Sequence, residues 1–318
     1  MSRQSLIRHW PEIAFALLFG GGLLLGGGAA LAALPNVLDA AVPDMTGQAA
    51  ADRSVVRLTL PPGYAQTAEA VPAVPAMAPA VPPAMASARP GPVIAICIDD
   101  LGEDPVATAK AIALPKEVAL SFLPYAEHTP SLAGVAGRKG HLVLAHVPMQ
   151  ALNGSDPGAM GLKPGMAADE IAKRMGWNLA RVPGLVGINN HEGSRFTADA
   201  AALKPVMAVL QARHLFFFDS RTGPRSAVGA AARAAGVTTA ARDIFLDDDP
   251  QPEAVSAQLE ALARQAKRTG AAIAIGHPRE ATLKLLAAWL AENDGVTLVP
   301  LDEAMKLKTD RAAALAAR

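Results

Sequence analysis

The chain has 318 residues with 29 basic and 29 acidic side chains, so its formal net charge is zero. This balance gives no electrostatic reason to expect nucleic-acid binding, which usually shows a basic surplus. Hydrophobic residues make up 51% of the chain, enough for one sizeable core. The single cysteine, Cys97, excludes an internal disulfide and is expected to be a small buried apolar residue.

The N-terminal part of the chain predicts export of the rest. Residues 13–34 are uncharged, rich in leucine, alanine and glycine, and just long enough to cross a bilayer as a helix of about 20 residues. Arginines precede this segment and aspartates follow it, so residues 1–12 are expected in the cytoplasm and the body of the chain in the periplasm. Small residues at 29–33 leave open a cleaved signal peptide and a secreted protein. We favour a single-pass anchor in the inner (plasma) membrane, because the apolar stretch exceeds a usual signal core.

Residues 35–92 form a linker whose alanine and proline content predicts an extended tether that buries little. The remainder, 93–318, is predicted to be one folded domain in which apolar runs alternate with amphipathic stretches. Strands are predicted at 93–98, 118–123, 141–146, 184–190, 214–219, 237–240, 271–276 and 296–299. Helices are predicted near 104–113, 129–138, 167–181, 198–212, 225–235, 251–269, 279–292 and 302–315.

The repeated strand–helix units indicate a parallel α/β sheet, either a closed barrel or an open doubly wound sheet. No glycine-rich phosphate loop follows any predicted strand, which argues against nucleotide binding. About eight such units, with acids and histidines at the strand ends, favour the barrel.

Chemically active side chains follow the predicted strands. Asp99 and Asp100 end the first strand, where two adjacent acids are costly to bury without a counter-charge or a metal. Other strands end at or near His146, His191, Asp219 and His277. Because the C-terminal ends of parallel strands face one cleft, these groups are expected to converge on one site, which predicts an enzyme. The alternatives are a helix N-cap for the acid pair and a hydrogen-bonded core role for a single histidine.

The segment 187–197 concentrates amide, imidazole, carboxylate and guanidinium groups between a strand and a helix, as binding loops do. A turn explains Asn190 but leaves His191 and Arg195 without a structural role.

Two later segments also carry polar groups. A pairing of Asp219 with Arg242 is expected to fix the geometry of two loops, and Asp219 orienting a histidine is the alternative. The acids at 247–249 are expected to form a solvated helix start. His277, followed by a proline that starts the next helix, suits general acid chemistry.

Taken in order, six motifs resemble the divergent polysaccharide deacetylase family, a branch of the metal-dependent carbohydrate deacetylases. They lie at 98–102 (Ile-Asp-Asp-Leu-Gly), 146–149 (His-Val-Pro-Met), 189–197 (Asn-Asn-His-Glu-Gly-Ser-Arg-Phe-Thr), 218–222 (Phe-Asp-Ser-Arg-Thr), 242–243 (Arg-Asp) and 275–278 (Ile-Gly-His-Pro). The resemblance spans residues 93–305 and leaves the transmembrane anchor and the linker outside it. It implies a distorted (β/α) barrel with a zinc-type site.

The resemblance implies that Asp100 is the metal carboxylate and Asp99 the catalytic base. His146 corresponds to the first histidine of the superfamily's His-x-x-x-His motif, but Gln150, a poor zinc ligand, stands at the second position. His191, on the next strand end, is expected to supply the missing nitrogen. The expected set is then Asp–His–His plus water, an open catalytic site.

The resemblance further implies that His277 is the general acid. The arginine–proline motif of the superfamily is absent in its usual form, and Arg195 is expected to stand in for it. Together with Asn190, Asp219 and Arg242, Arg195 is assigned to substrate binding.

The predicted function is hydrolysis of N-acetyl or O-acetyl groups on a cell-envelope glycan, with one divalent metal ion, expected to be zinc. The expected partners are the acetylated glycan and the membrane, with no nucleic acid and no signal for oligomerisation. Gln150 favours the alternative of a non-catalytic periplasmic glycan-binding or scaffold protein with a degenerate deacetylase site. A third option is a different metal hydrolase on the same scaffold, such as a peptidoglycan amidase.

Overall fold

The structure, a computed structural model, describes residues 91–292 and 295–316. The predicted membrane segment and nearly all of the linker lie outside these residues, so the anchor and the domain limits stay predictions. Among the described residues, none of the helices combines the length and the apolar character that a membrane span needs.

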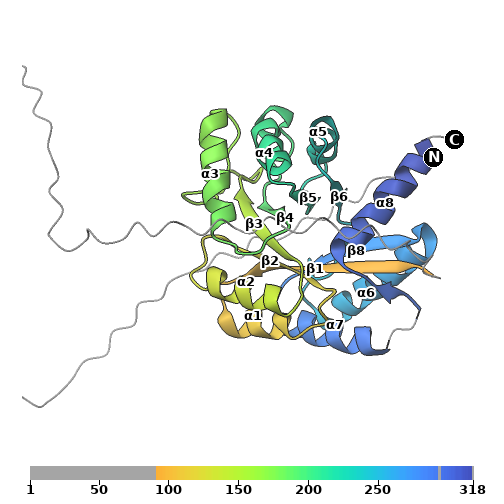
Figure 1. The fold of residues 1–318 in the computed structure, drawn as a ribbon. Helices are drawn as coiled ribbons and strands as arrows, with labels where there is room; N and C mark the ends of the chain where they lie inside the picture. The colour runs from red at the N-terminus through yellow and green to blue at the C-terminus, as the bar shows by residue number, and fades with distance from the viewer. Residues whose placement is uncertain (1–90, 293–294, 317–318) are drawn as a thin grey trace, which may run out of the picture. The chain divides into compact units, whose positions relative to one another are not determined.

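Strands and helices alternate along the described chain, except at 239–245, where two short strands follow one another (Figure 1). Its strands are β1 (Val93–Leu101), β2 (Ala119–Phe122), β3 (Val143–Met149), β4 (Gly187–Glu192), β5 (Phe216–Asp219), β6 (Thr239–Ala241), β7 (Ile244–Phe245), β8 (Ala271–Gly276) and β9 (Thr297–Leu298). Its helices are α1 (Pro105–Ile112), α2 (Thr129–Arg138), α3 (Ala168–Ala180), α4 (Ala200–Ala212), α5 (Val228–Ala235), α6 (Pro252–Thr269), α7 (Glu280–Glu292) and α8 (Leu301–Ala316).

All strand pairs of the sheet are parallel, in the order β6-β5-β4-β3-β2-β1-β8-β7, with β9 added beside β1. Both faces of such a sheet need cover, which explains why β1 and β8 are almost continuous runs of buried apolar residues. The parallel α/β architecture expected from the sequence is therefore confirmed.

The sheet curves into an incomplete barrel. No pairing joins β6 to β7 in the described part of the chain, although only Arg242 and Asp243 separate these two edge strands. The amide of Arg242 donates to Asp219 on the β5 side, and the amide of Asp243 donates to Ile273 on β8. Lys308 of α8 contacts both carboxylate oxygens of Asp243 at 2.6 Å. The chain thus crosses the open edge covalently, and α8 holds the crossing in place.

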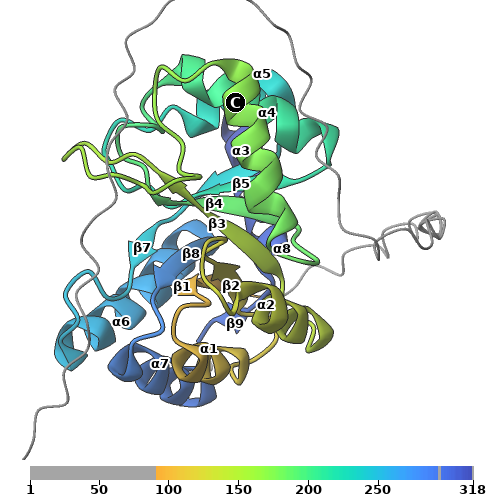
Figure 2. The same ribbon diagram turned by 90° about the vertical axis from the view of Figure 1, so that its left-hand side faces the viewer.

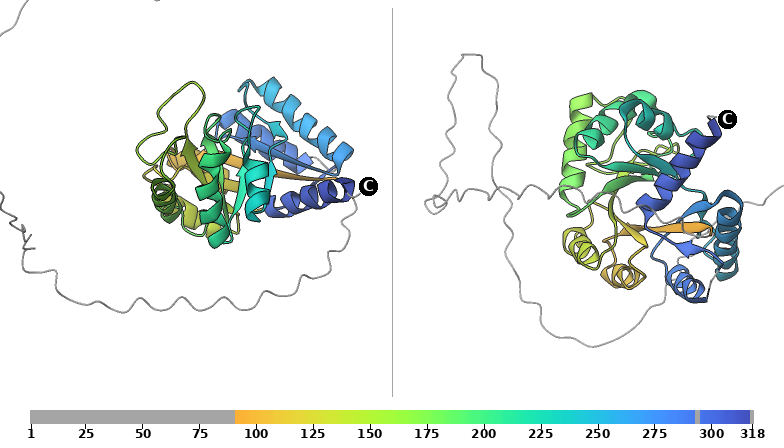
Figure 3. Two further views of the ribbon diagram at one scale, coloured as in Figure 1. Left: turned by 90° about the horizontal axis from the view of Figure 1, so that it is seen from above. Right: turned by 45° about the vertical axis from the view of Figure 1, so that its right-hand side comes forward.

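Two apolar clusters lie on the two sides of this sheet. The larger packs the outer face against the helices, which Figure 2 shows as α3, α4 and α5 above and α1, α2, α6 and α7 below. The smaller fills the inside, where alternate residues of β1 such as Ala95 and Cys97 meet Phe218 and, from α8, Leu301 and Met305. In the right-hand view of Figure 3, α8 (dark blue) lies between the green and the blue helices. The helix therefore closes the barrel where the strands leave it open.

Two differences from the predicted elements matter for function. β1 continues past residue 98 to Leu101, so the adjacent acids are part of the strand rather than of the loop that follows it. The short strand β7 occupies 244–245, within a stretch predicted to be loop, and brings the acids that follow it to the end of β8. Periodicity could not predict so short a strand.

Candidate active site

Seven of the nine predicted site residues line one cleft at the C-terminal, inner end of the barrel, and Arg195 and Asp219 do not. Side chains alternate along a strand, so Asp99 continues the inner row that Cys97 belongs to. His146 follows the inner Leu144 on β3, and the register of β3 with β4 puts His146 opposite Asn189. This cleft has a volume of about 510 Å³.

An irregularity in β1 brings two adjacent carboxylates to this one cleft. The pairing of β1 with β2 shifts register between Ile98 and Leu101, and Asp100 has φ of +57°. Left-handed backbone at a residue other than glycine costs roughly 1 kcal/mol or more, and such strain is typical of functional sites. Asp99 is 2% exposed and Asp100 34% exposed, and both line the cleft. A regular strand would point them to opposite faces.

Asp100, His146 and His191 form a compact cluster. Nε2 of His146 lies 3.2 Å and Nδ1 of His191 2.9 Å from the same oxygen, Oδ1 of Asp100. The three candidate ligand atoms lie within 4.8 Å of one another, a set that could hold a metal ion. Burial alone would raise the pKa of Asp100, but hydrogen bonds with the two imidazoles outweigh it and lower that pKa. Two imidazoles and one carboxylate are the donor set of an open catalytic zinc site, so these residues fit the expected ion.

Gln150 lies outside this cluster. Its backbone joins the loops around the end of β3, because its amide donates to Leu162 and its carbonyl accepts from Arg195 and Phe196. It is not among the residues that line the cleft. The position where the superfamily has its second histidine is therefore structural here, and His191 takes its place beside Asp100.

Asn189 is a buried residue that joins the base candidate to a ligand candidate. Its Nδ2 donates to both carboxylate oxygens of Asp99, at 2.8 and 2.9 Å. Because the carboxylate only accepts, the side-chain oxygen of Asn189 must face His146, whose Nδ1 lies 2.8 Å from it. Nδ1 of His146 is then the protonated nitrogen, which leaves Nε2 for the cluster. Ser121 donates to the same Asn189 oxygen at 2.5 Å.

His277 lies on the other side of Asp100, with its Nε2 3.6 Å from Oδ2 of that carboxylate. Its Nδ1 is 2.9 Å from Oδ1 of Asp247, while its amide and the hydroxyl of Thr282 donate to Oδ2 of Asp247. Asp247 is 0% exposed, so the prediction of a solvated helix start at 247–249 is wrong for this residue. Sequence reasoning missed it because β7, which brings Asp247 to the end of β8, was not predicted.

Comparisons with known proteins agree with this geometry. Residues 96–305 match the divergent polysaccharide deacetylase family. The chain belongs to this family. An uncharacterized protein of Haemophilus influenzae is 38% identical over 197 residues, which cover 62% of this chain and 70% of that protein. The uncharacterized protein YibQ of Escherichia coli is 36% identical over 193 residues, covering 61% of this chain and 60% of YibQ.

Among solved structures, the uncharacterized protein ATU2773 from Agrobacterium tumefaciens C58 has the same fold. The superposition has a TM-score of 0.64 at 29% identity and covers 66% of this chain and 88% of that one. The match over residues 96–305 establishes the family, and the likeness to ATU2773 supports the fold of this domain.

The four residues assigned to substrate binding have different environments in this family member. Asn190 is buried and its amide bonds the backbone at Ser220 and Glu192, so it shapes the loops that line the cleft. Arg195 is exposed and is not among the residues that line the cleft, so its side chain is not brought to the site.

Asp219 and Arg242 each fix loop geometry, but through other partners, because the predicted pairing of their side chains is not among the contacts of the described residues. Asp219 accepts from the hydroxyl of Ser226 at 2.7 Å and from the amide of Arg221 at 2.8 Å. It therefore does not orient a histidine, and that alternative is wrong. The guanidinium of Arg242 donates to the carbonyls of Ser220 and Arg221, and burial lowers its pKa. Arg242 also lines the cleft, where its charge is available to a substrate.

Proposed function

We propose that this domain is a metal-dependent hydrolase that removes acetyl groups from a cell-envelope glycan, with zinc as the ion. The observation that carries this proposal is the position of Asp100. One of its oxygens meets two imidazole ligands, and the other lies 3.6 Å from Nε2 of His277. A group held at the cluster is therefore within reach of an acid candidate and of Asp99.

Asp100, His146 and His191 would hold the ion. A bound zinc would polarise the acetyl carbonyl and lower the pKa of a water molecule to about 7. Asp99 lies next to the cluster, since its Oδ2 is 3.7 Å from Nε2 of His146. We assign to this carboxylate the removal of a proton from the attacking water. Asn189 holds both of its oxygens in place, so the base is oriented before the substrate arrives.

His277 is suited to protonate the leaving amine. Asp247 accepts from Nδ1 of the imidazole, so Nε2 is the nitrogen that faces the cleft. Burial alone would lower the pKa of His277, but the hydrogen bond with Asp247 and the charges of Asp99 and Asp247 raise it. A histidine whose pKa is raised and whose ring is oriented by a carboxylate is suited to act as a general acid.

The walls of the cleft supply groups that can orient a glycan. Ser220 lines it, and its buried hydroxyl has no hydrogen-bond partner in the described structure. Since buried hydroxyls rarely stay unpaired, we assign this one to a hydroxyl or the acetyl group of the substrate. We also propose that the domain faces this glycan from the outer side of the plasma membrane, on the basis of residues 13–34.

The test is acetate release by the full chain, purified in detergent and loaded with zinc, from a panel of acetylated glycans. We expect zinc-dependent release from at least one envelope-type polymer, and loss of release after chelation with recovery on adding zinc back. Release of peptides or amines from muropeptides without acetate would instead support an amidase.

A second candidate is a glycan-binding protein without catalysis, which Gln150 favours because it removes a ligand from the superfamily's usual set. Glycan binding by the zinc-loaded chain with no acetate release from any member of the panel would establish that candidate.

A further inference from the structure

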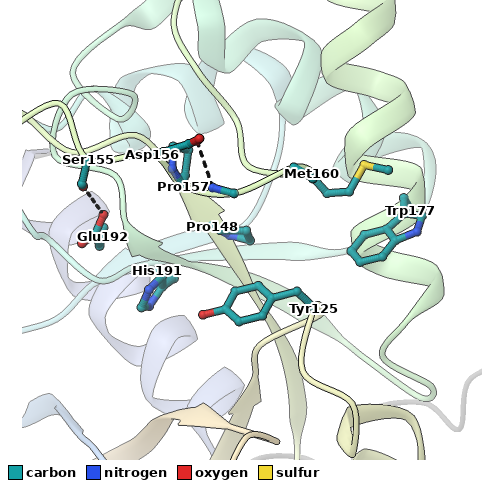
Figure 4. Close-up of a pocket in the computed structure, with 11 residues that line it drawn as sticks. Tyr125, Pro148, Ser155, Asp156, Pro157, Met160, Trp177, His191 and Glu192 are labelled. Atoms are coloured by element: carbon teal, nitrogen blue, oxygen red, sulfur yellow. Dashed lines mark hydrogen bonds between the residues drawn. The ribbon is translucent and has the colours of Figure 1, made fainter. Parts of the chain in front are cut away.

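A second cavity adjoins the cleft that contains the Asp100 cluster, and the proposed reaction does not use it. It has a volume of about 430 Å³ and shares His191 and Glu192 with the cleft. Figure 4 shows Tyr125 below it with the hydroxyl pointing toward His191, Met160 above it, and Trp177 at the end away from His191. The two cavities meet at these shared residues, so a chain-like ligand bound at the cluster can reach this one.

Helix α3 holds the walls of this cavity in place. Arg174 and the buried Asn178 donate to the backbone carbonyls of 160–161, at 2.7 and 3.0 Å. Arg181, which follows α3, donates to the carbonyls on either side of Tyr125, at 3.0 and 3.2 Å. Both loops are therefore tied to one rigid element. A cavity that is already formed loses little conformational entropy when a ligand binds.

The lining is aromatic and apolar with an acidic rim. Tyr125 is 46% exposed, one of three large hydrophobic side chains left exposed in the described part of the chain. Beside the aromatic rings lie proline and methionine, while Asp156 and Glu192 provide carboxylates. Asp156 is paired with Lys163 at 3.0 Å, and no lysine or arginine is among the described residues that line the cavity.

This chemistry matches a pyranose ring without negative charge. One face of such a ring presents C–H groups that pack on an aromatic side chain, and its edge carries hydroxyls that donate to carboxylates. The volume lies within the range of about 300–1,000 Å³ that is usual for small-ligand sites. An anionic sugar in this cavity would meet the charge of Glu192, and no lysine or arginine among the described lining residues would face it.

We propose that this cavity binds the sugar next to the acetylated one, and that it accepts neutral or amino sugars and disfavours uronic acids. The inference rests on the proposed function for its orientation, because it places the reacting sugar at the Asp100 cluster. It adds to that function a preference for polymeric over monomeric substrate.

The experiment compares β-1,4-linked N-acetylglucosamine probes of one to four units on the zinc-loaded full chain. Affinity is measured by calorimetry and acetate release in parallel. We expect the tetramer to bind more tightly than the monomer, and Tyr125→Ala and Trp177→Ala each to remove about tenfold of that advantage. Both variants should leave monomer affinity unchanged and raise KM for the tetramer more than they change kcat.

Two control variants separate stacking from general effects. Tyr125→Phe keeps the ring and should stay within about twofold of the wild type, because stacking needs only the aromatic face. Val106→Ala removes a 64% exposed hydrophobic side chain outside this cavity and should change neither affinity. A galacturonate tetramer should bind more weakly than the N-acetylglucosamine tetramer.

The outcomes distinguish this inference from the proposed function. Length-dependent binding that the two alanine variants abolish, without acetate release, would keep the sugar site and overturn hydrolysis. Acetate release that is independent of chain length and of both aromatic residues would keep hydrolysis and overturn the sugar site. Equal losses for monomer and tetramer, or tight binding of a muropeptide stem in this cavity, would also overturn it.

Discussion

The two sides of the cleft use the same residue types in opposite ways. On the β3–β4 side, two imidazoles share a single oxygen of Asp100, which is partly exposed. On the β8 side, a single imidazole, His277, has Asp247 to itself, and that carboxylate is fully buried and also accepts from an amide and a hydroxyl. In the first arrangement, two imidazole nitrogens and a carboxylate oxygen lie close together beside the cleft. In the second, a carboxylate fixes the orientation of one imidazole ring.

Both sides of the cleft use histidine and aspartate. The number of imidazoles that share one carboxylate, rather than the residue type, therefore distinguishes the candidate metal ligands from the candidate proton donor. Two imidazole nitrogens and a carboxylate oxygen that lie close together form a donor set suited to binding a cation. A carboxylate that pairs with one imidazole favours the protonated form of that ring and fixes its orientation, as a general acid requires. The predictions below test this division, beginning with the largest expected effect.

The acid pair should separate ligand from base. Asp100→Asn is expected to abolish metal binding and acetate release together, because it removes the negative charge on which both imidazoles converge. Asp99→Asn should keep the metal, since the three ligands remain, and should lower kcat by roughly 100- to 10,000-fold, the contribution of a positioned base. Metal analysis and acetate release on both variants check this. Metal loss in Asp99→Asn with retention in Asp100→Asn would reverse the two roles.

Asp247 should act through His277 alone. Asp247→Asn is expected to leave metal content unchanged and to lower kcat by roughly 10- to 100-fold. Because the carboxylate raises the pKa of His277, its loss should lower that pKa. A general acid works while protonated, so the alkaline limb of the pH–rate profile should move to lower pH. An unshifted limb with reduced kcat would show that Asp247 only supports the fold.

Asn189 should affect metal affinity by orienting His146. Asn189→Ala is expected to weaken zinc binding by about 10- to 100-fold, the usual cost of losing a group that orients a ligand. The matched control is Asn190→Ala. The amide of Asn190 bonds only loop groups, so this change should lower the melting temperature while zinc affinity stays near that of the wild type. Equal zinc affinities in the two variants would remove Asn189 from this role.

The metal-free protein should have a narrow optimum of stability. Burial would lower the pKa of His146, but the charge of Asp99 and contacts with Asp100 raise it to about 9. Its contribution is full below its unfolded pKa of about 6.5 and is lost as the pH rises through about 9. The pKa of Asp100 is lowered, so its contribution is full above about 3.9 and is lost as the pH falls.

Thermal melts of the chelated protein should therefore show the highest melting temperature between about pH 4 and 6.5. Zinc binding at neutral pH should release a proton from His146 and become tighter as the pH rises. Zinc affinity that does not depend on pH between 6.5 and 9 would show that His146 is not a ligand.

Much of this site could be predicted because the ends of the long strands can be recognised in the sequence. Apolar runs predicted each long strand, and parallel topology then implied that Asp99, Asp100, His146 and His277 would meet at one end. His191 was expected to be the third metal ligand, because Gln150 stands where the superfamily has its second histidine. The structure puts His191 beside Asp100, as that reasoning expected.

Other parts could not be predicted, for physical reasons. The role of Asp247 depends on the two-residue strand β7, which is too short to leave a periodic signal. Asn189 acts through pairing between distant strands, which one sequence does not reveal. The site next to Tyr125 and Trp177 is formed by three segments whose proximity depends on side-chain to backbone hydrogen bonds. The prediction for Arg195 is not supported, because this exposed residue is not among those that line the cleft that its motif borders.

The matched pair His191→Gln and His277→Gln tests directly whether His191 is a metal ligand and His277 is not. Both histidines line the same cleft, and both lie within 4 Å of Asp100. Zinc per chain is measured by plasma mass spectrometry after equilibrium dialysis. We expect close to one zinc ion per chain in the wild type and in His277→Gln, and a sharp loss of zinc in His191→Gln. Full retention in His191→Gln, or loss in His277→Gln, would contradict this assignment.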